Sequence, residues 1–365
     1  MRFLTAGESH GEGLSVLVDG FPAGVTISPD AINHQLARRQ IGYGRGGRMK
    51  IETDRARILS GVRFQKSTGA PIALFIENRD WKNWTDVMSV DGERGEAAEA
   101  KSFIRPRPGH ADLTYFLKYG IRDYRGGGRS SARETACRVA AGAVARKVIN
   151  HILKKDIIIQ GAVTQVGKLA VNPRNFNWKE VRKNNFFSPD KKIVKVWEEY
   201  LTTTRKKGSS LGAKIVVNAK NVPAGLGEPV YGKLDAELAA AMMSINAVKG
   251  VEIGSGNDSI ELTGDQNSDE LRMDKRKKIT FSSNNSGGIL GGISSGQNID
   301  VSITVKPTSS ILKSQKTINN KFKNTTISTK GRHDPCVGLR AVPIAEAMMA
   351  CVLADQIMRN KAQCG

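Results

Sequence analysis

The fold prediction starts from the stretch Ile299-Asp300-Val301-Ser302-Ile303-Thr304-Val305. It is followed directly by Lys306-Pro307-Thr308-Ser309-Ser310. Its apolar β-branched residues alternate with polar ones, a period of two that predicts a strand with one buried face. That strand runs straight into a cation and three hydroxyl groups, which together suit a phosphate. On local sequence alone, a plain surface turn is an equal alternative for this second segment.

Other elements follow from capping residues and periodicity. Ser28-Pro29 predicts an N-cap and a first-turn proline for a helix to about Gln40. Ser131-Ala132-Arg133-Glu134 predicts a capping box that opens a helix to about Lys154. Two more helices, from Asp235 to about Ala247 and from Pro343 to about Arg359, are expected to be buried in a core or in an oligomer interface. The remaining predicted strands are Leu14–Val18, Ile51–Thr53, Ile157–Ile159 and Ile215–Val217. Because strands and helices do not alternate regularly, we expect a layered α+β fold and no doubly wound sheet.

Composition excludes several classes of protein. The chain has 365 residues, of which 39% are hydrophobic and 25% charged, an ordinary globular balance. No run approaches the roughly 18 apolar residues of a membrane span, and the N-terminus lacks the pattern of a signal peptide. The four cysteines are far apart, so neither a disulfide framework nor a zinc site is indicated. We therefore expect a cytoplasmic protein with buried or inert thiols.

The formal charge of +21 implies an anionic partner. Lysine-rich runs such as Lys275–Lys278 and Arg205–Lys207 indicate solvated loops and faces. The arginines, in contrast, lie among glycines, where guanidinium groups and backbone N–H groups can hold phosphate or carboxylate. This pattern favours a small polyanion held from several sides. A nucleic-acid-binding protein is the alternative that the net charge leaves open.

One glycine-rich motif has the wrong surroundings for its usual function. Gly42-Tyr43-Gly44-Arg45-Gly46-Gly47 matches the dinucleotide fingerprint, which would make the protein an NAD-dependent dehydrogenase. That fingerprint needs a strand before it and a helix after it, whereas here a helix precedes it and a strand follows. We therefore expect a loop that displays Arg45 and Arg48.

The five histidines fall into two groups. His34 and His151 lie within predicted helices and are expected to be structural. His10 and His110 lie in glycine-flanked turns, where an imidazole can face a ligand and exchange a proton near neutral pH. On spacing alone, a catalytic and a structural role are equally supported for these two. Asp112 is placed to orient His110, and no pair of histidines has the spacing of a metal site.

Two further turns can bind anions. Gly126-Gly127-Gly128-Arg129-Ser130-Ser131 leads into a helix start, where free N–H groups and the helix dipole attract negative charge. Gly331-Arg332-His333-Asp334-Pro335-Cys336 places a cation, an imidazole and a carboxylate in one turn. A plain surface turn is an equal alternative for this second segment.

Taken in order along the chain, these blocks resemble the chorismate synthase family. The similar segments are residues 7–11, 107–112, 119–136, 287–297, 306–310 and 331–338. The resemblance implies one domain over residues 1–365 with a β-α-β sandwich of antiparallel sheets and helices. It also implies a lyase that converts 5-enolpyruvylshikimate 3-phosphate to chorismate and phosphate by anti-1,4-elimination and requires reduced FMN. A homotetramer is expected from the same resemblance.

The resemblance also assigns site residues. By similarity, His10 protonates the departing phosphate, His110 acts at the reduced flavin, and Asp334 works through the flavin in removing the ring proton. Positions similar to FMN contacts are Arg129, Ser130, Ser131, Asn246, Ala247, Gly291, Lys306, Pro307, Thr308, Ser309, Ser310 and Arg332. Positions similar to substrate contacts are Ser9, Arg48, Arg107 and Arg133. Arg39 and Arg45 are expected to hold either the substrate or NADPH, which would be a second cofactor if the flavin is reduced in place.

Overall fold

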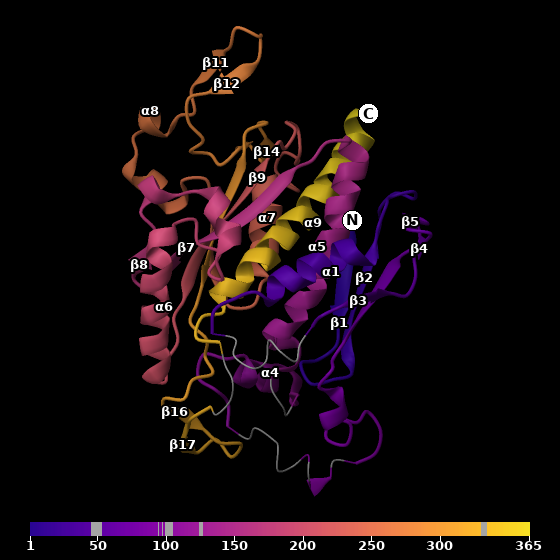
Figure 1. The fold of residues 1–365 in the computed structure, drawn as a ribbon, viewed down its shortest axis with the longest axis vertical. Coiled ribbons are helices and arrows are strands. Elements are labelled where there is room, and N and C mark those ends of the chain that lie inside the picture. Colours follow the sequence, from indigo (N-terminus) through magenta and orange to yellow (C-terminus); the bar gives the residue numbers. More distant parts are fainter. Residues whose placement is uncertain (45–52, 94, 97, 99–104, 124–126, 330–333) are drawn as a thin grey trace.

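The computed structural model describes residues 1–44, 53–93, 95, 96, 98, 105–123, 127–329 and 334–365. Within them, two antiparallel sheets enclose a layer of helices (Figure 1). The first sheet has the order β1-β2-β6-β3 and consists of β1 (Arg2–Ala6), β2 (Gly13–Asp19), β3 (Ala56–Ile58) and β6 (Ile72–Glu77). The second has the order β10-β15-β9-β7-β8 and consists of β7 (Ile158–Val166), β8 (Leu169–Ala170), β9 (Ala213–Lys220), β10 (Val248–Ile253) and β15 (Ile299–Val305). The predicted α+β architecture is confirmed.

The remaining elements are helices and short hairpins. The helices are α1 (Pro29–Gln40), α4 (Asp112–Tyr119), α5 (Thr135–Leu153), α6 (Lys191–Lys206), α7 (Leu234–Met243), α8 (Gly264–Asn267) and α9 (Gly338–Cys364). Short 3₁₀ turns cover Trp81–Asn83, Gly128–Ser130, Ala132–Glu134, Pro173–Asn175, Trp178–Lys183 and Gly256–Glu261. The hairpins pair β4 (Val62–Arg63) with β5 (Lys66–Ser67), β11 (Leu271–Met273) with β12 (Ile279–Phe281), β13 (Ile289–Leu290) with β14 (Ile293–Ser294), and β16 (Gln315–Ile318) with β17 (Asn324–Ile327).

Helices α5 and α9 form the middle of the sandwich. The first sheet packs on α5 and the second on α9, while the two helices pack closely on each other. A Cβ atom added at Gly142 would lie only 2.4 Å from the Cβ of Ala347, so the helices can approach this closely only because that position is glycine. Although α9 is long and apolar enough to cross a membrane, 83% of its most apolar stretch is buried inside the protein. Its apolar surface therefore belongs to the core of this chain, the first of the two alternatives that the sequence left open.

One buried carboxylate ties this layer together. Glu346 of α9 is 1% exposed. Its Oε2 accepts from Nη1 of Arg38 in α1 at 2.6 Å and from Nη2 of Arg146 in α5 at 3.2 Å. Its Oε1 accepts from the backbone N–H of Gly161 in β7 at 2.9 Å. One side chain thus connects three helices and a strand, and the hydrogen bonds and cations offset the cost of burying its charge.

Strand β15 has the predicted alternation of buried and less buried residues. In β15, Ile299, Val301, Ile303 and Val305 are all buried while the intervening residues are not. The predicted helix at residues 29–40 is also confirmed, with the Ser28 hydroxyl accepting from the backbone N–H of Ala31. The predicted strands at residues 14–18 and 215–217 lie in β2 and β9, and the one predicted at 157–159 overlaps the start of β7 at Ile158. The strand predicted at Ile51–Thr53 includes residues 51 and 52, which lie outside the described part of the chain.

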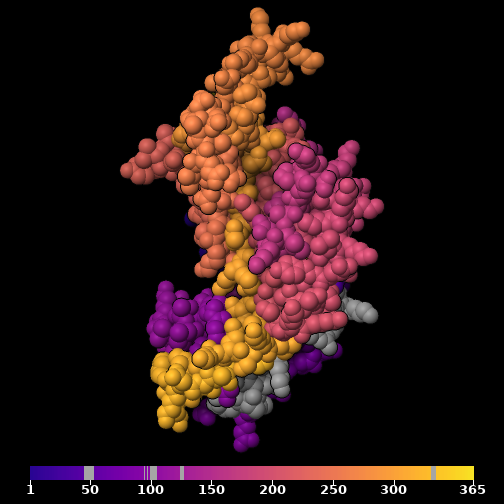
Figure 2. All heavy atoms as spheres, turned by 90° about the vertical axis from the view of Figure 1, so that its left-hand side faces the viewer, coloured from indigo at the N-terminus to yellow at the C-terminus, as the bar shows by residue number. Residues whose placement is uncertain are grey.

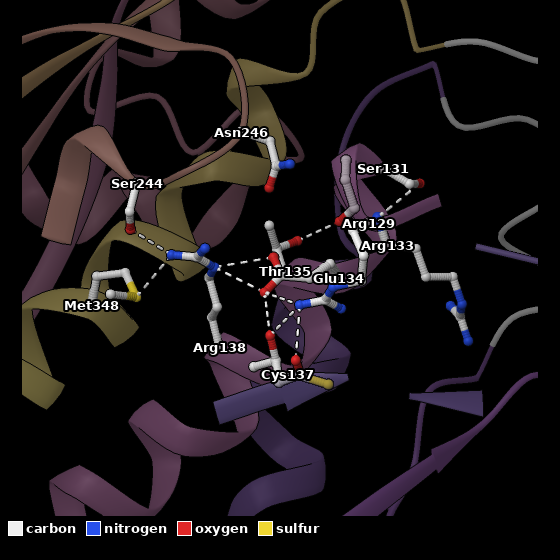
Figure 3. Close-up of polar contacts among 12 residues, drawn as sticks. Arg129, Ser131, Arg133, Glu134, Thr135, Cys137, Arg138, Ser244, Asn246 and Met348 are labelled. Atoms are coloured by element: carbon white, nitrogen blue, oxygen red, sulfur yellow. Dashed lines mark hydrogen bonds and ion pairs between the residues drawn. The ribbon is translucent and has the colours of Figure 1, made fainter. Parts of the chain in front are cut away.

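Three predicted helix ends differ from the structure. Ser131 accepts from the backbone N–H of Arg133, but Glu134 does not complete a capping box, because its carboxylate binds Thr5 and Arg138 instead (Figure 3). Helix α7 ends at Met243, a few residues early. Helix α9 begins at Gly338, which leaves Pro343 in its interior. The lost backbone hydrogen bond at the proline is outweighed by burial of the surrounding helix face.

Candidate functional site

A cavity of about 390 Å³ opens where segments distant in the sequence meet at one end of the helix layer. Its walls come from the turn after β1, the turn before α4, the approach to α5, the segment after α7, the segment after β15 and the start of α9. The expected site residues that line it are Ser9, His10, Arg39, Arg107, His110, Ser130, Ser131, Arg133, Asn246, Ala247, Lys306, Pro307, Thr308, Ser309, Ser310 and Asp334. The fold therefore brings most of the expected residues into one space.

A larger hollow elsewhere lacks the charged residues expected of the functional site. That hollow measures about 830 Å³ and lies where the ends of α5 and β9 meet the segment from Phe281 to Asn298. Among its described lining residues, Lys155 alone is charged, and none belongs to the expected site. Because a polyanion needs convergent cations, we place the candidate site in the smaller cavity.

Asp112 organises one wall of the cavity. Its carboxylate accepts from Arg107 Nε at 2.8 Å and Arg107 Nη2 at 2.9 Å, and lies 3.0 Å from both His110 Nδ1 and Arg122 Nη1. Burial alone would raise the pKa of Asp112, but hydrogen bonds from Arg107 and His110 outweigh it and hold that pKa well below its usual range. The expected orienting contact between Asp112 and His110 is confirmed.

Asp54 binds a second set of arginines, Arg39 and Arg133, which also line the cavity. Its carboxylate accepts from Arg133 Nη1 at 2.7 Å and from Arg39 Nη1 at 3.3 Å. Arg39 also donates from Nε to the Thr135 hydroxyl at 3.0 Å and from Nη2 to the Ala132 carbonyl at 2.7 Å. All three charged side chains are almost completely buried. Two cations that line the cavity are thus fixed by one carboxylate behind them.

The turn that carries Ser9 and His10 is anchored from two sides. Arg129 donates to the carbonyl oxygens of Thr5 and Gly7, both at 3.0 Å, and Asn78 donates to the carbonyl of Gly11 at 2.8 Å. The imidazole of His10 lies against the indole of Trp84, with ring centroids 4.2 Å apart. Trp84 in turn donates from Nε1 to Asp80 at 2.7 Å. The ring of His10 is therefore held in place at the edge of the cavity.

The segment after β15 closes the remaining side. Lys306 Nζ and the Ser309 hydroxyl both donate to the Gly109 carbonyl, at 2.5 and 2.7 Å, which fastens this segment to the turn of His110. The Ser310 hydroxyl accepts from Arg107 Nη1 at 3.0 Å. The Thr308 hydroxyl donates to the Asp334 carbonyl at 3.1 Å, and the Asp334 carboxylate lies 2.8 Å from Arg340 Nε. These contacts place a cation, several hydroxyls and a carboxylate on one wall.

Two buried side-chain oxygen atoms on the lining have no hydrogen-bond partner within the described part of the chain. They are Ser9 Oγ and Asn246 Oδ1. Asn246 Nδ2 donates to the Ser130 carbonyl at 3.0 Å, so its oxygen is directed elsewhere (Figure 3). Its neighbour Ala247 has a φ of +69°, a conformation that is costly for a residue with a side chain. Unsatisfied polar atoms and backbone strain are both features of a binding site that is built for a ligand.

Some expected residues lie elsewhere. Arg129 does not line the cavity, since its guanidinium points to the end of β1, and it contacts Glu134 at 3.7 Å (Figure 3). Gly291 lies in the turn between β13 and β14, outside the described lining. Arg45, Arg48 and Arg332 lie outside the described residues.

The structure also places the remaining glycine motif, histidines and cysteines of the sequence analysis. Helix α1 precedes Gly42, so the dinucleotide-binding interpretation of that motif is excluded. His34 and His151 lie on α1 and α5, as predicted. Cys137, Cys336 and Cys351 are buried, whereas Cys364 is exposed. Within the described ranges, no group of three or more potential ligands is placed to hold a metal ion.

Sequence reasoning missed Asp54, Trp84 and Arg340. Asp54 follows residues 45–52 with no motif of its own, and its partners come from positions 15 and 79 residues away. Trp84 and Arg340 likewise lie outside any short pattern. Arg39 and Arg133 were both expected to contact a ligand, but nothing in their local sequence pointed to the buried anion that binds both.

Comparisons with known proteins converge on one family. The family model described as chorismate synthase matches residues 1–358. A protein of Pelagibacter ubique named chorismate synthase is 55% identical over 365 residues, covering 100% of this chain and 97% of its own length. One of Parvibaculum lavamentivorans with the same name is 52% identical over 370 residues, covering 100% and 96%. A solved structure titled "Crystal Structure of Chorismate Synthase" matches with a TM-score of 0.75 and 35% identity, over 99% of this chain and 92% of that one.

Proposed function

The chain belongs to the chorismate synthase family, and on that premise we propose that the 390 Å³ cavity is where it binds reduced FMN and 5-enolpyruvylshikimate 3-phosphate. The protein is a lyase that releases phosphate to form chorismate, in the pathway to the aromatic amino acids. The family acts on a small molecule, and no nucleic-acid partner is implied. The observation that carries the proposal is the convergence of Arg39, Arg107 and Arg133 on one cavity.

The substrate suits these walls. It carries a phosphate and two carboxylates, and a buried guanidinium group is the side chain best able to hold either. Arg107 and Arg133 are proposed to bind the substrate, with the hydroxyl of Ser9 as a further partner. Because Asp54 and Asp112 fix the arginines before a ligand arrives, little reorganisation is needed when charge develops on the leaving phosphate.

Proton transfer is assigned to the two histidines of the lining. Nδ1 of His110 is engaged within the protein, 3.0 Å from Asp112 and 3.2 Å from Arg107 Nη2, which leaves Nε2 to exchange a proton with a ligand. Packing on Trp84 holds the imidazole of His10, so that it can deliver a proton to the departing phosphate. Asp334 is oriented by Arg340 and is proposed to take part in removing the ring proton.

The lining also fits a flavin nucleotide. Asn246 Oδ1 is a buried acceptor in need of a donor, such as a ring N–H, and Lys306 with the hydroxyls of Thr308 and Ser309 can bind a phosphate or carbonyl oxygen. Ser130, Ser131, Ala247, Pro307 and Ser310 complete the proposed contacts. When bound, reduced FMN would lend electron density to the substrate during the elimination. NADPH is proposed only as a reductant of this flavin, with Arg39 at the cavity as its described candidate contact.

The assembly of the protein is part of the proposal. We expect one domain over residues 1–365, a homotetramer and a cytoplasmic location. Support for assembly comes from Leu4 and Leu17, which pair across β1 and β2 and are 75% and 47% exposed on the outer face of the first sheet. Paired exposed leucines on a sheet face are typical of a surface that another subunit covers.

An anaerobic assay tests the proposal. Purified protein with reduced FMN should convert 5-enolpyruvylshikimate 3-phosphate to chorismate and phosphate. No phosphate release under these conditions would overturn the proposed chemistry. A second reaction with oxidised FMN and NADPH, without an added reductase, distinguishes a protein that reduces its own flavin from one that depends on another enzyme.

A further inference from the structure

A group of exposed cations lies on segments that are joined to the cavity wall and takes no part in the proposed chemistry. It consists of Arg205, Lys206 and Lys207 at the end of α6, and Lys313, Lys316, Lys321 and Lys323 around the hairpin β16–β17. We call this group the basic rim. In Figure 2 the hairpin lies beside the lower end of the surface formed by residues 160–220. All seven side chains are exposed.

Hydrogen bonds fasten the rim to the lining. The Ser210 hydroxyl donates to the carbonyl of Thr308 at 2.7 Å, and the backbone N–H of Lys313 donates to the carbonyl of Gly208 at 3.1 Å. The Thr317 hydroxyl donates to the carbonyl of Pro106, next to Arg107, at 2.6 Å. These contacts join both parts of the rim to segments that form the cavity wall.

Chain geometry then limits how far the charges can be from the cavity. Lys313 follows the lining residue Ser310 by three positions, so their Cα atoms lie within about 11 Å. Lys207 precedes by the same number Ser210, whose hydroxyl binds the lining residue Thr308. These separations are close to the Debye length of about 8 to 10 Å at physiological salt, so the charges of the rim act on an anion that approaches this part of the wall.

The charge of the rim is also poorly compensated along the chain. Between Val301 and His333 the sequence has no aspartate or glutamate, and there is none from Tyr200 to Gly212. Glu198 and Glu199 lie about two turns before Lys206 on α6. In contrast, another exposed lysine-rich run, Lys275–Lys278, directly follows Asp274 and lies near Asp269 and Glu270 in the sequence.

We propose that the basic rim draws anionic ligands, the phosphorylated dicarboxylate and FMN, toward the cavity before the buried arginines bind them. This rests on the proposed function and adds a separate step to it. Uncompensated charge of one sign around a cleft raises association rates by about 10- to 1,000-fold, and it does so less as salt increases. The rim acts on the rate of encounter, whereas the buried arginines act on the bound state.

The test compares two triple charge reversals. K206E/K207E/K313E alters the rim, and K275E/R276E/K278E alters the turn between β11 and β12, at the opposite end of the long axis (Figure 1). Each lowers the formal charge by six, from +21 to +15. Stopped-flow mixing would measure association of oxidised FMN with the protein, and of the substrate with the FMN complex, between about 20 mM and 0.5 M salt.

We expect the rim variant to associate about tenfold more slowly at low salt. Its dissociation rate and kcat should stay within about twofold, and the difference should vanish at high salt because the charges are screened. The distal variant should match the wild type. Equal slowing of both variants, an unaltered rate in the rim variant, or a wild-type rate that is independent of salt would each overturn the proposal.

Two controls separate an effect of the rim from a loss of stability and from a failure of the proposed function. If the rim variant melts at a clearly lower temperature, K206Q/K207Q/K313Q replaces it, with an expected effect of about half the size on a logarithmic scale. Failure of the wild type to form chorismate would overturn the proposed function itself. Normal wild-type turnover with equal association rates in all variants would overturn the rim alone.

Discussion

Arg38 and Arg39 are neighbours on α1, yet they serve two different regions. Arg38 reaches Glu346 within the helix layer, at 2.6 Å. Arg39 reaches Asp54 beside the cavity, at 3.3 Å. In each region one buried carboxylate binds two arginines, but only the arginines of Asp54 open onto the cavity. The same ion-pair chemistry therefore maintains the fold in one place and prepares a binding wall in the other.

The largest effect is expected on the cavity side. His10→Ala and His110→Ala should each lower kcat by about 100-fold or more, because each removes a proposed proton donor or acceptor. Steady-state turnover under anaerobic conditions measures this. The matched control is His34→Ala on the exposed face of α1, which should turn over normally. Wild-type rates in both cavity variants would return His10 and His110 to a structural role.

The two carboxylates can be compared directly. Asp54→Asn should lower kcat/KM by about tenfold, because Arg39 and Arg133 lose the anion that orients them. Glu346→Gln should leave kcat/KM of the folded protein within about twofold. Both should lose about 3 kcal/mol of unfolding free energy, since each leaves buried cations without a partner. Equal kinetic loss in the two variants would contradict the division between the regions.

The ion pairs of Asp112 predict how the unfolding free energy depends on pH. Because the pKa of Asp112 is held below its usual range, its ionised form stabilises the folded state above its unfolded pKa of about 4. That stabilisation is lost as the pH falls below this value. Between about pH 5 and pH 2, unfolding free energy measured with denaturant should therefore decline more steeply for the wild type than for Asp112→Asn. Parallel curves would mean that the Asp112 cluster contributes nothing to acid sensitivity.

The smallest effect concerns the buried thiols. Burial raises the pKa of Cys137 and of Cys351 to about 12, and that of Cys336 to about 11. Their thiolates, which are the reactive forms, are therefore scarce at pH 8. A thiol reagent should label one site, the exposed Cys364, in the native protein and four after denaturation. Rapid labelling of a second thiol in the native protein would show that a buried thiol becomes accessible through local opening of the structure.

Local patterns predicted the fold where one segment carries its own signal. The alternation in β15 and the cap at Ser28 both appear in the structure as expected. The strand β1 was not predicted, because Arg2–Ala6 shows little alternation and is defined by its pairing with β2. The predictions for the end of α7 and the start of α9 were wrong because tertiary packing, and not the local cap or proline, determines where these helices end and begin.

The candidate site divides in the same way. Motifs identified the turns of His10 and His110 and the segment after β15, since those residues are close in sequence. Asp54 and Arg340 could not be found, because they act through partners that only the fold brings near. Arg129 shows the converse: its surroundings resemble an anion site, yet its guanidinium supports the turn of His10.

Strand β15 lies between β9 and β10 and continues directly into the cavity wall. Any ligand that binds residues 306–310 is thus attached to an interior strand of the five-stranded sheet. Binding energy is then linked to global unfolding: a ligand present at 100 times its Kd stabilises the native state by about 2.7 kcal/mol. Amide hydrogen exchange along β15 should slow by the corresponding factor of about 100, so occupancy of the cavity can be followed from an interior strand of the sheet.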